Sequence, residues 1–111
     1  MDTLNTYRSY IQDIINEYSQ YKSAYGDVER EAIFDTTHDH YQLMTVGWNS
    51  YQRIHATLLH VDIRQGKIWI QYDGTEEGIA NRLVELGVPR EDIVLAFHPP
   101  YKRPYTNFAV G

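Results

Sequence analysis

The side chains in this sequence that could bind a metal ion or move a proton are five histidines and fifteen carboxylates, in 111 residues without cysteine. The candidate ligands are His38, Asp39, His40, His55, His60 and Asp62. His60 and Asp62 would share one face of a predicted strand, because side chains two apart in a strand point the same way. His55 would point to the opposite face if that strand is regular, and residues 38–40 fall in a predicted turn. Zinc needs three or four convergent ligands. Because the sequence offers only dispersed pairs, we predict surface or cross-strand histidines, no metal site and no cofactor.

Nucleophilic catalysis has little support in the sequence. Cysteine is absent, the four serines lie in predicted helix or turn segments, and the G-x-S-x-G elbow of serine hydrolases does not occur. A pair of carboxylates could act as general acid and base, but nothing in the spacing of the acidic residues selects one. We therefore predict that the protein is not an enzyme. The alternative is a small-molecule-binding or hydrolytic domain with a pocket formed by His60, Asp62, Trp69 and His98.

The C-terminal segment His98–Tyr105 is the most informative stretch of the chain. It joins three prolines, two tyrosines, two adjacent cations and one imidazole in a protein that is otherwise acidic. Proline-rich backbone is preorganised and loses little entropy on docking, and Tyr and Arg are enriched at binding hot spots. We predict a partner-binding surface made of Trp69, His98, Tyr101, Lys102, Arg103 and Tyr105. The alternative is a strap across the sheet, with Tyr105 and Phe108 as its apolar plugs.

The net charge limits the class of partner. Ten cationic side chains against fifteen anionic ones give a formal charge of −5. Binding to DNA needs a basic surface that neutralises phosphates, so we expect no strong direct DNA binding. No apolar run approaches the roughly 20 residues of a membrane span, and the N-terminus lacks the pattern of a secretory signal. We expect no membrane association and a cytoplasmic location.

The elements that must position these side chains follow from the apolar periodicity. Spacings of three and four predict a helix from about Thr3 to Ala24, which Gly26 would end. Alternation then predicts a strand from Val28, followed by the turn TTHDH. A second strand would place one set of apolar side chains on a single face: Met44, Val46 and Trp48.

The third and fourth strands form the most strongly predicted hairpin. The third, over residues 53–63, changes its apolar face near Leu58 and Leu59, which indicates either a bulge or a central strand covered on both faces. A two-residue turn at Gln65-Gly66 would pair Ile63 with Ile68, Val61 with Ile70 and Leu59 with Tyr72. All six side chains would then lie on one buried face of the sheet.

A second helix and a last strand complete the prediction. Thr75 has the chemistry of an N-cap, and Gly87 would end the helix. Its residues Ile79, Leu83 and Leu86 should pack on the sheet. The apolar run at residues 93–97 predicts a strand covered on both faces beside one of the hairpin strands, and the tail at 98–111 should be extended and irregular. The predicted fold is a single α+β domain over residues 1–111: an N-terminal helix, a four-stranded antiparallel meander, a helix and a fifth strand, with the helices on one sheet face.

Several stretches resemble the XisI-like family, named for the fdxN-element excision controlling factor. They are DHYQLM, IWIQYDGTE, GVPREDIVLAFHPP and RPYTNFA, and the resemblance extends over nearly the whole chain. It implies a small accessory protein of cyanobacterial type that acts with an XisH-like partner protein in excision of a DNA element by a site-specific recombinase. It brings no established catalytic or binding residues. The expected partner is therefore an XisH-like protein, with a homodimer as the alternative.

Overall fold

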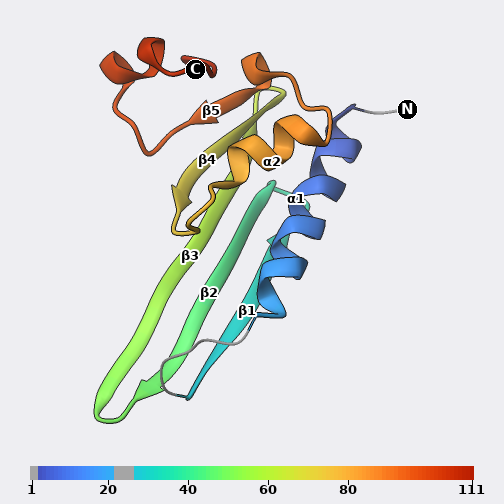
Figure 1. Ribbon diagram of the computed structural model, residues 1–111. Coiled ribbons are helices and arrows are strands. Elements are labelled where there is room, and N and C mark those ends of the chain that lie inside the picture. Colours follow the sequence, from blue (N-terminus) through green and yellow to red (C-terminus); the bar gives the residue numbers. More distant parts are fainter. Residues whose placement is uncertain (1–2, 22–26) are drawn as a thin grey trace.

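The computed structural model describes residues 3–21 and 27–111 (Figure 1). In chain order the elements are α1 (Thr3–Ser19), β1 (Asp27–Asp35), β2 (His40–Asn49), β3 (Gln52–Arg64), β4 (Lys67–Asp73), α2 (Ile79–Glu85), the 3₁₀ turn η1 (Arg90–Asp92), β5 (Ile93–Leu95) and the 3₁₀ turn η2 (Pro100–Tyr105). The α+β class predicted from the sequence is confirmed.

The five strands form one sheet in the order β1-β2-β3-β4-β5. Strands β1 to β4 are antiparallel neighbours, and β5 is parallel to β4. The parallel pair needs a crossover connection, which α2 and η1 provide. The predicted order of helix, antiparallel strands, helix and final strand is confirmed, and β5 does lie beside a strand of the predicted hairpin.

The hydrophobic core lies between the helices and one face of the sheet (Figure 1). Helix α1 buries side chains at the predicted spacing of three and four, and the sheet contributes the aliphatic residues of β3 and β4. Burying each large aliphatic side chain contributes roughly 1.5–3 kcal/mol. The main core residues are Tyr7, Ile11, Ile14, Ile15, Tyr41, Leu43, Leu59, Val61, Ile63, Ile68, Ile70, Ile79, Leu83, Val88 and Ile93.

A β-bulge in β3 changes which side chains face the core. Leu43 pairs with Leu59 and Met44 pairs with Thr57, so Leu58 has no counterpart in β2. The bulged alternative that the sequence left open is therefore confirmed. Because a bulge inserts one residue into only one strand of a pair, it reverses the alternation on either side.

A second bulge overturns one predicted pair of the β3–β4 hairpin. The pairs Ile63–Ile68 and Val61–Ile70 form as predicted, but the next residue of β4, Gln71, has no counterpart in β3. Tyr72 therefore lies opposite His60 instead of Leu59, and half of its surface is exposed. The prediction that Tyr72 joins the buried face is wrong.

The three apolar residues of β2 that were predicted to share one face do so, but that face is not the one that packs on the core. Tyr41 and Leu43 are fully buried, whereas Met44 and Val46 are half-buried and Trp48 is exposed. Side chains alternate along β2, whose partner β3 carries the extra residue of the bulge, so Met44, Val46 and Trp48 lie on the face opposite Tyr41 and Leu43, away from the helices. The β2–β3 hairpin also extends beyond the end of α1 (Figure 1).

Both helices are shorter than predicted. α1 ends at Ser19, and the rest of the predicted helix up to Ala24, with its stop at Gly26, lies outside the described residues except for positions 20 and 21. α2 starts only at Ile79, so the predicted N-cap role of Thr75 is wrong. Leu86 follows the last helical residue and is exposed, which contradicts its predicted packing on the sheet. In the described part of the chain, neither helix has the length and apolarity that crossing a membrane requires.

The start of α2 is capped by Asp73 from the end of β4. Its carboxylate accepts hydrogen bonds from the backbone N–H groups of Thr75 (2.9 Å) and Ile79 (2.8 Å) and from the Thr75 hydroxyl (2.5 Å). The Thr75 hydroxyl in turn accepts the N–H of Gly78. A carboxylate is a stronger acceptor for free helix N–H groups than a hydroxyl, so Asp73 takes the capping role and Thr75 supports the turn.

The C-terminal tail is more regular than the predicted extended segment. Residues Pro100–Tyr105 form a 3₁₀ turn in which the N–H of Lys102 donates to the carbonyl of Pro99 at 2.9 Å. The chain then returns to β5, where the N–H of Ala109 donates to the carbonyl of Ile93 at 2.8 Å. Proline at the start of a 3₁₀ or helical turn is favourable because its φ is already set and its missing N–H is not needed.

Candidate functional site

Two histidines and a carboxylate meet on the sheet face opposite the helices. His60 and Asp62 share this face of β3, as their spacing predicted. β2 adds a third side chain, because His40 pairs with Asp62 in the antiparallel register. His40 is the first residue of β2 and not part of the preceding turn. We name His40, His60 and Asp62 the histidine–aspartate cluster. The expectation that the histidines form only dispersed pairs is therefore wrong.

The geometry of the histidine–aspartate cluster centres on one carboxylate oxygen. Oδ1 of Asp62 lies 2.8 Å from Nδ1 of His40 and 3.0 Å from Nε2 of His60. Oδ2 accepts a hydrogen bond from the amide of Gln71 at 3.2 Å and lies 3.5 Å from Nη2 of Arg64. Only 2% of the surface of Asp62 is exposed. A buried carboxylate needs such partners, because an unpaired buried charge is very costly.

The two other histidines of the N-terminal half lie outside the cluster. His38 is exposed and contacts the Asp35 carboxylate at 2.9 Å, and His55 pairs with Val46 in the projecting part of the hairpin. Asp39, between His38 and His40, points elsewhere. It forms an ion pair with Arg8 at 2.7 Å, and this guanidinium lowers the pKa of the Asp39 carboxyl. Asp39 is thus directed away from the cluster, whereas the ring of His38 stacks beside that of His40 with 6.5 Å between their centroids.

Trp69 lies beside the histidine–aspartate cluster, opposite Asp62 in the β3–β4 register. The indole is half-buried, because two guanidinium groups lie over its ring. The Cζ atoms of Arg64 and Arg103 are 5.8 and 5.7 Å from the ring centroid, a cation–π arrangement. The indole N–H donates to the carbonyl of Arg64 at 3.3 Å. Trp69 therefore joins the sheet to the C-terminal tail.

The side chain of Arg103 holds the tail together from inside. Its Nε donates to the carbonyl of His98 at 3.0 Å, and its terminal nitrogens lie 3.4 and 3.5 Å from the carbonyls of Val110 and Ala96. These contacts close the tail into a loop over Trp69. Arg103 therefore fits the alternative in which the tail is a strap across the sheet. Its side chain is engaged within the tail and is not displayed to solvent as a free contact residue.

Other residues of the tail do point outward. Tyr101 is 72% exposed and Tyr105 is 90% exposed, and Lys102 is exposed between them. Tyr105 is therefore not the plug of a strap. The ring of His98 packs on Phe97 at 4.6 Å between centroids, and the contacts found in the described residues do not link it to the histidine–aspartate cluster. Of the alternative pocket, the structure brings together His60, Asp62 and Trp69.

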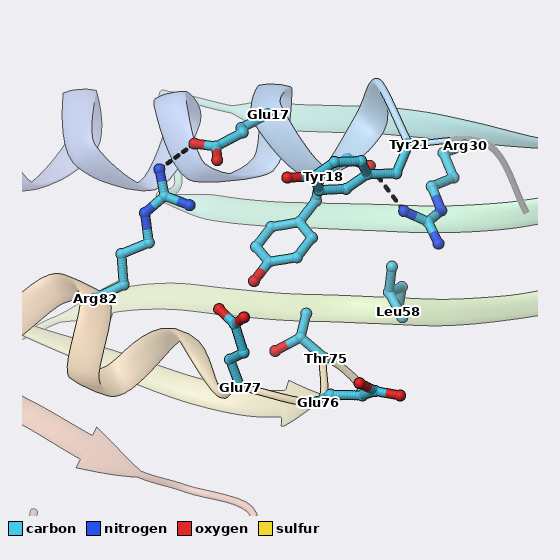
Figure 2. Close-up of a pocket in the computed structure, with 10 residues that line it drawn as sticks. Glu17, Tyr18, Tyr21, Arg30, Leu58, Thr75, Glu76, Glu77 and Arg82 are labelled. Atoms are coloured by element: carbon cyan, nitrogen blue, oxygen red, sulfur yellow. Dashed lines mark hydrogen bonds and ion pairs between the residues drawn. The ribbon is translucent and has the colours of Figure 1, made fainter.

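A pocket of about 440 Å³ lies elsewhere, on the helix side of the sheet. It opens between the end of α1, the bulge of β3 and the β4–α2 connection, and Tyr18 points across it toward that connection (Figure 2). Burial, followed by the charge of Glu77, raises the pKa of the Tyr18 hydroxyl. The lining carries both carboxylates and guanidinium groups, so it selects neither sign of ligand charge. Its residues are Glu17, Tyr18, Tyr21, Arg30, Leu58, Gly74, Thr75, Glu76, Glu77 and Arg82.

Comparison with known proteins decides the family. The model of the family described as XisI protein matches residues 1–110. The chain belongs to the XisI family. A crystal structure of a XisI-like protein from Anabaena variabilis has 42% identity and a TM-score of 0.91, over 97% of this chain and 99% of the other. The crystal structure of the fdxN element excision controlling factor XisI from the same organism has 37% identity and a TM-score of 0.87, over 99% and 100% of the two chains. No curated protein matches.

In this XisI-family protein, sequence reasoning named His40 as a candidate ligand but did not bring it together with His60 and Asp62, and it missed the pocket. The signal for His40 was present, because His60 and Asp62 alternate in β3 and His40 and Gln42 alternate in the preceding strand. Bringing them together required the pairing of β2 with β3, which the bulge at Leu58 sets. The pocket depends on the same bulge, since Leu58 lines it.

Proposed function

We propose that this XisI-family protein is a non-catalytic accessory factor that controls excision of a DNA element by binding an XisH-like partner protein. The excision role is supported by its similarity to the Anabaena variabilis protein described as an excision controlling factor. The observation that carries the binding mode is the outward display of Tyr101 and Tyr105 on a 3₁₀ turn fixed from behind by Arg103.

Exposed tyrosines on a fixed turn are well suited to binding. Tyrosine offers a large contact area and a polar hydroxyl, and it loses little side-chain entropy on binding. The turn is already ordered by the hydrogen bonds of Arg103 and by the return of the chain to β5. A preorganised surface avoids much of the ordering cost of association. Tyr101, Lys102 and Tyr105 are therefore the central contacts of the proposed interface, and Arg103 supports them.

The charge of the protein favours a protein partner over direct contact with DNA. The formal charge is −5, and Lys102 and Arg103 are the only adjacent cations of the tail. Arg103 is engaged with backbone carbonyls, so this pair offers at most one free phosphate contact. We predict no sub-micromolar binding to duplex DNA at about 150 mM salt, where one or two phosphate contacts are strongly screened. A fluorescence anisotropy titration that gives such an affinity would contradict this part of the proposal.

The test is co-expression with an XisH-like protein, followed by co-purification and a titration. The double variant Tyr101→Ala/Tyr105→Ala should bind at least about thirtyfold more weakly, because truncating a central aromatic anchor costs about 2 kcal/mol or more. Tyr51→Ala is the matched control, since Tyr51 is a fully exposed tyrosine in the turn between β2 and β3. That turn lies at the opposite end of the molecule from the tail (Figure 1).

The outcomes separate the possibilities. Loss of binding in the folded double variant, with normal binding by Tyr51→Ala, supports the proposal. Full binding by a double variant with an unchanged melting temperature places the interface elsewhere. Loss of self-association in the double variant, without an effect on the XisH-like protein, would make the tail a homodimer contact instead.

A further inference from the structure

The histidine–aspartate cluster has the composition of a transition-metal site. Imidazole nitrogens are common zinc ligands, and a carboxylate oxygen is a frequent third ligand, with water in the fourth position. The atoms that face one another are Nδ1 of His40, Nε2 of His60 and Oδ1 of Asp62, and the three residues each offer a ligand atom within 4.8 Å of the other two. They come from two neighbouring strands whose pairing fixes their separation.

We propose that this cluster binds a zinc ion between His40, His60 and Asp62, on the sheet face opposite the helices. The ion would join β2 to β3 and leave one coordination position open to solvent. This is a property of the chain beyond its proposed role as a partner-binding factor, and it concerns residues separate from Tyr101 and Tyr105.

Two of the three ligand separations fit a zinc ion after small side-chain rotations, and the two nitrogens, which lie within 4.8 Å of each other, must move closer together. A tetrahedral zinc with bonds of about 2.0–2.1 Å places its ligand atoms about 3.3–3.4 Å apart. The two nitrogen–oxygen distances are 2.8 and 3.0 Å, so each must open by only about 0.3–0.6 Å to reach that value. Each ring must also present a lone pair at the ligating nitrogen, with its proton on the other ring nitrogen. Zinc then takes the place of the two protons that pointed at Oδ1, and the two nitrogens become its ligands.

Access and orientation also favour the site. The side chains of His40 and His60 are 49% and 32% exposed, so an ion can reach the cluster from solvent without opening the core. Asp62 is fixed from the other side, because Gln71 donates to its second oxygen. Outer-shell hydrogen bonds of this kind orient metal ligands, and their loss typically lowers affinity about 10–100-fold.

The composition of the cluster predicts its selectivity. Magnesium and calcium prefer sites made of oxygen ligands only, whereas two imidazoles and one carboxylate suit zinc and its neighbours. Arg64 opposes any cation, because its guanidinium lies 3.5 Å from Oδ2 of Asp62. More than half of this side chain is exposed, so it can move away. Its charge should nevertheless weaken zinc binding.

The experiment is a titration of untagged, chelator-treated protein with Zn²⁺ against a fluorescent zinc chelator. We expect one ion per chain. His40→Gln and His60→Gln should each weaken binding at least about tenfold, a loss no smaller than that of an outer-shell partner. Glutamine can still donate a hydrogen bond to Asp62 but is a poor zinc ligand, so these variants should remain folded. His55→Gln is the matched control and should bind as the wild type does.

Two further measurements distinguish a built site from general histidine binding. Arg64→Gln should bind zinc severalfold more tightly, because it removes a cation beside the cluster. Millimolar Mg²⁺ or Ca²⁺ should not displace Zn²⁺. The proposal is overturned if His40→Gln and His60→Gln bind zinc like the wild type, if His55→Gln lowers affinity as much as they do, or if the wild type does not bind zinc at all.

Discussion

Replacing Tyr7 with phenylalanine should destabilise the protein at neutral pH and make it less sensitive to alkali. Tyr7 is a core residue of α1, and its hydroxyl donates to Oδ2 of Asp92 in η1 at 2.5 Å. Burial, and then the hydrogen bond to Asp92, raise the pKa of Tyr7 from 10.0 to about 12. The folded state therefore favours the neutral hydroxyl more strongly than the unfolded chain does.

The size of both effects follows from these two facts. At pH 7 the variant loses a hydrogen bond to a charged acceptor, which contributes about 1.5–3 kcal/mol. A raised pKa means that the stabilisation is complete below pH 10 and is lost as the pH rises through 12. At pH 11, midway between the two pKa values, the wild type has lost about 1.4 kcal/mol through Tyr7, because one pKa unit corresponds to about 1.36 kcal/mol. The variant has no such group to ionise.

The assay is urea unfolding of both proteins at pH 7.5 and pH 11, followed by circular dichroism. The difference in unfolding free energy between wild type and Tyr7→Phe should shrink by about 1.4 kcal/mol at the higher pH. Tyr51→Phe is the control, because Tyr51 is fully exposed and should show no difference at either pH. An equal difference for Tyr7→Phe at the two pH values would refute the linkage between its hydroxyl, Asp92 and stability.

Two further pairs of substitutions test how the chain is packed. Gly47→Ala should lower the free energy of unfolding by about 2–4 kcal/mol, because a Cβ there would lie 2.1 Å from the carbonyl oxygen of Asp27 and the φ of Gly47 is +153°. Gly66→Ala has open space around its Cβ and should lower it by only about 1–2 kcal/mol, as measured by thermal unfolding. Arg103→Ala should lower stability by about 2 kcal/mol through its lost carbonyl and Trp69 contacts, whereas Lys102→Ala should stay within about 0.5 kcal/mol. Equal melting temperatures for the two members of either pair would contradict the packing described.

Local patterns were sufficient to predict the β3–β4 hairpin near its turn. Gln65-Gly66 fixes the register, and the aliphatic pairs Ile63–Ile68 and Val61–Ile70 follow from it. The prediction fails beyond Ile70, because Gln71 has no counterpart in β3 and the register shifts by one residue there. In β3 the apolar face changes near Leu58 and Leu59, which indicated the bulge, whereas the sequence of β4 has no such change. A bulge can be predicted from the sequence only when it changes the alternation of apolar residues along the strand.

The candidate sites show the same limit at longer range. Composition identified the tail as a candidate interface, but it did not predict which of its side chains turn inward and which point to solvent. Arg103 turns inward and Tyr105 points outward because the chain folds back on β5, a contact that no local spacing encodes. His40 joined the cluster for a similar reason: its partner lies 22 residues away in β3.

The hydrogen bond between Tyr7 and Asp92 also has a consequence for biosynthesis. The two residues are 85 positions apart, and a ribosome adds about 5–20 residues per second. Asp92 is therefore synthesised about 4–17 seconds after Tyr7, and their hydrogen bond cannot form before then. During that time α1 can settle only on the strands already synthesised, and its apolar face is open to chaperones in the cell. Helix α1 is thus fixed through Tyr7 only after η1 has been made, although it precedes all the strands of the sheet.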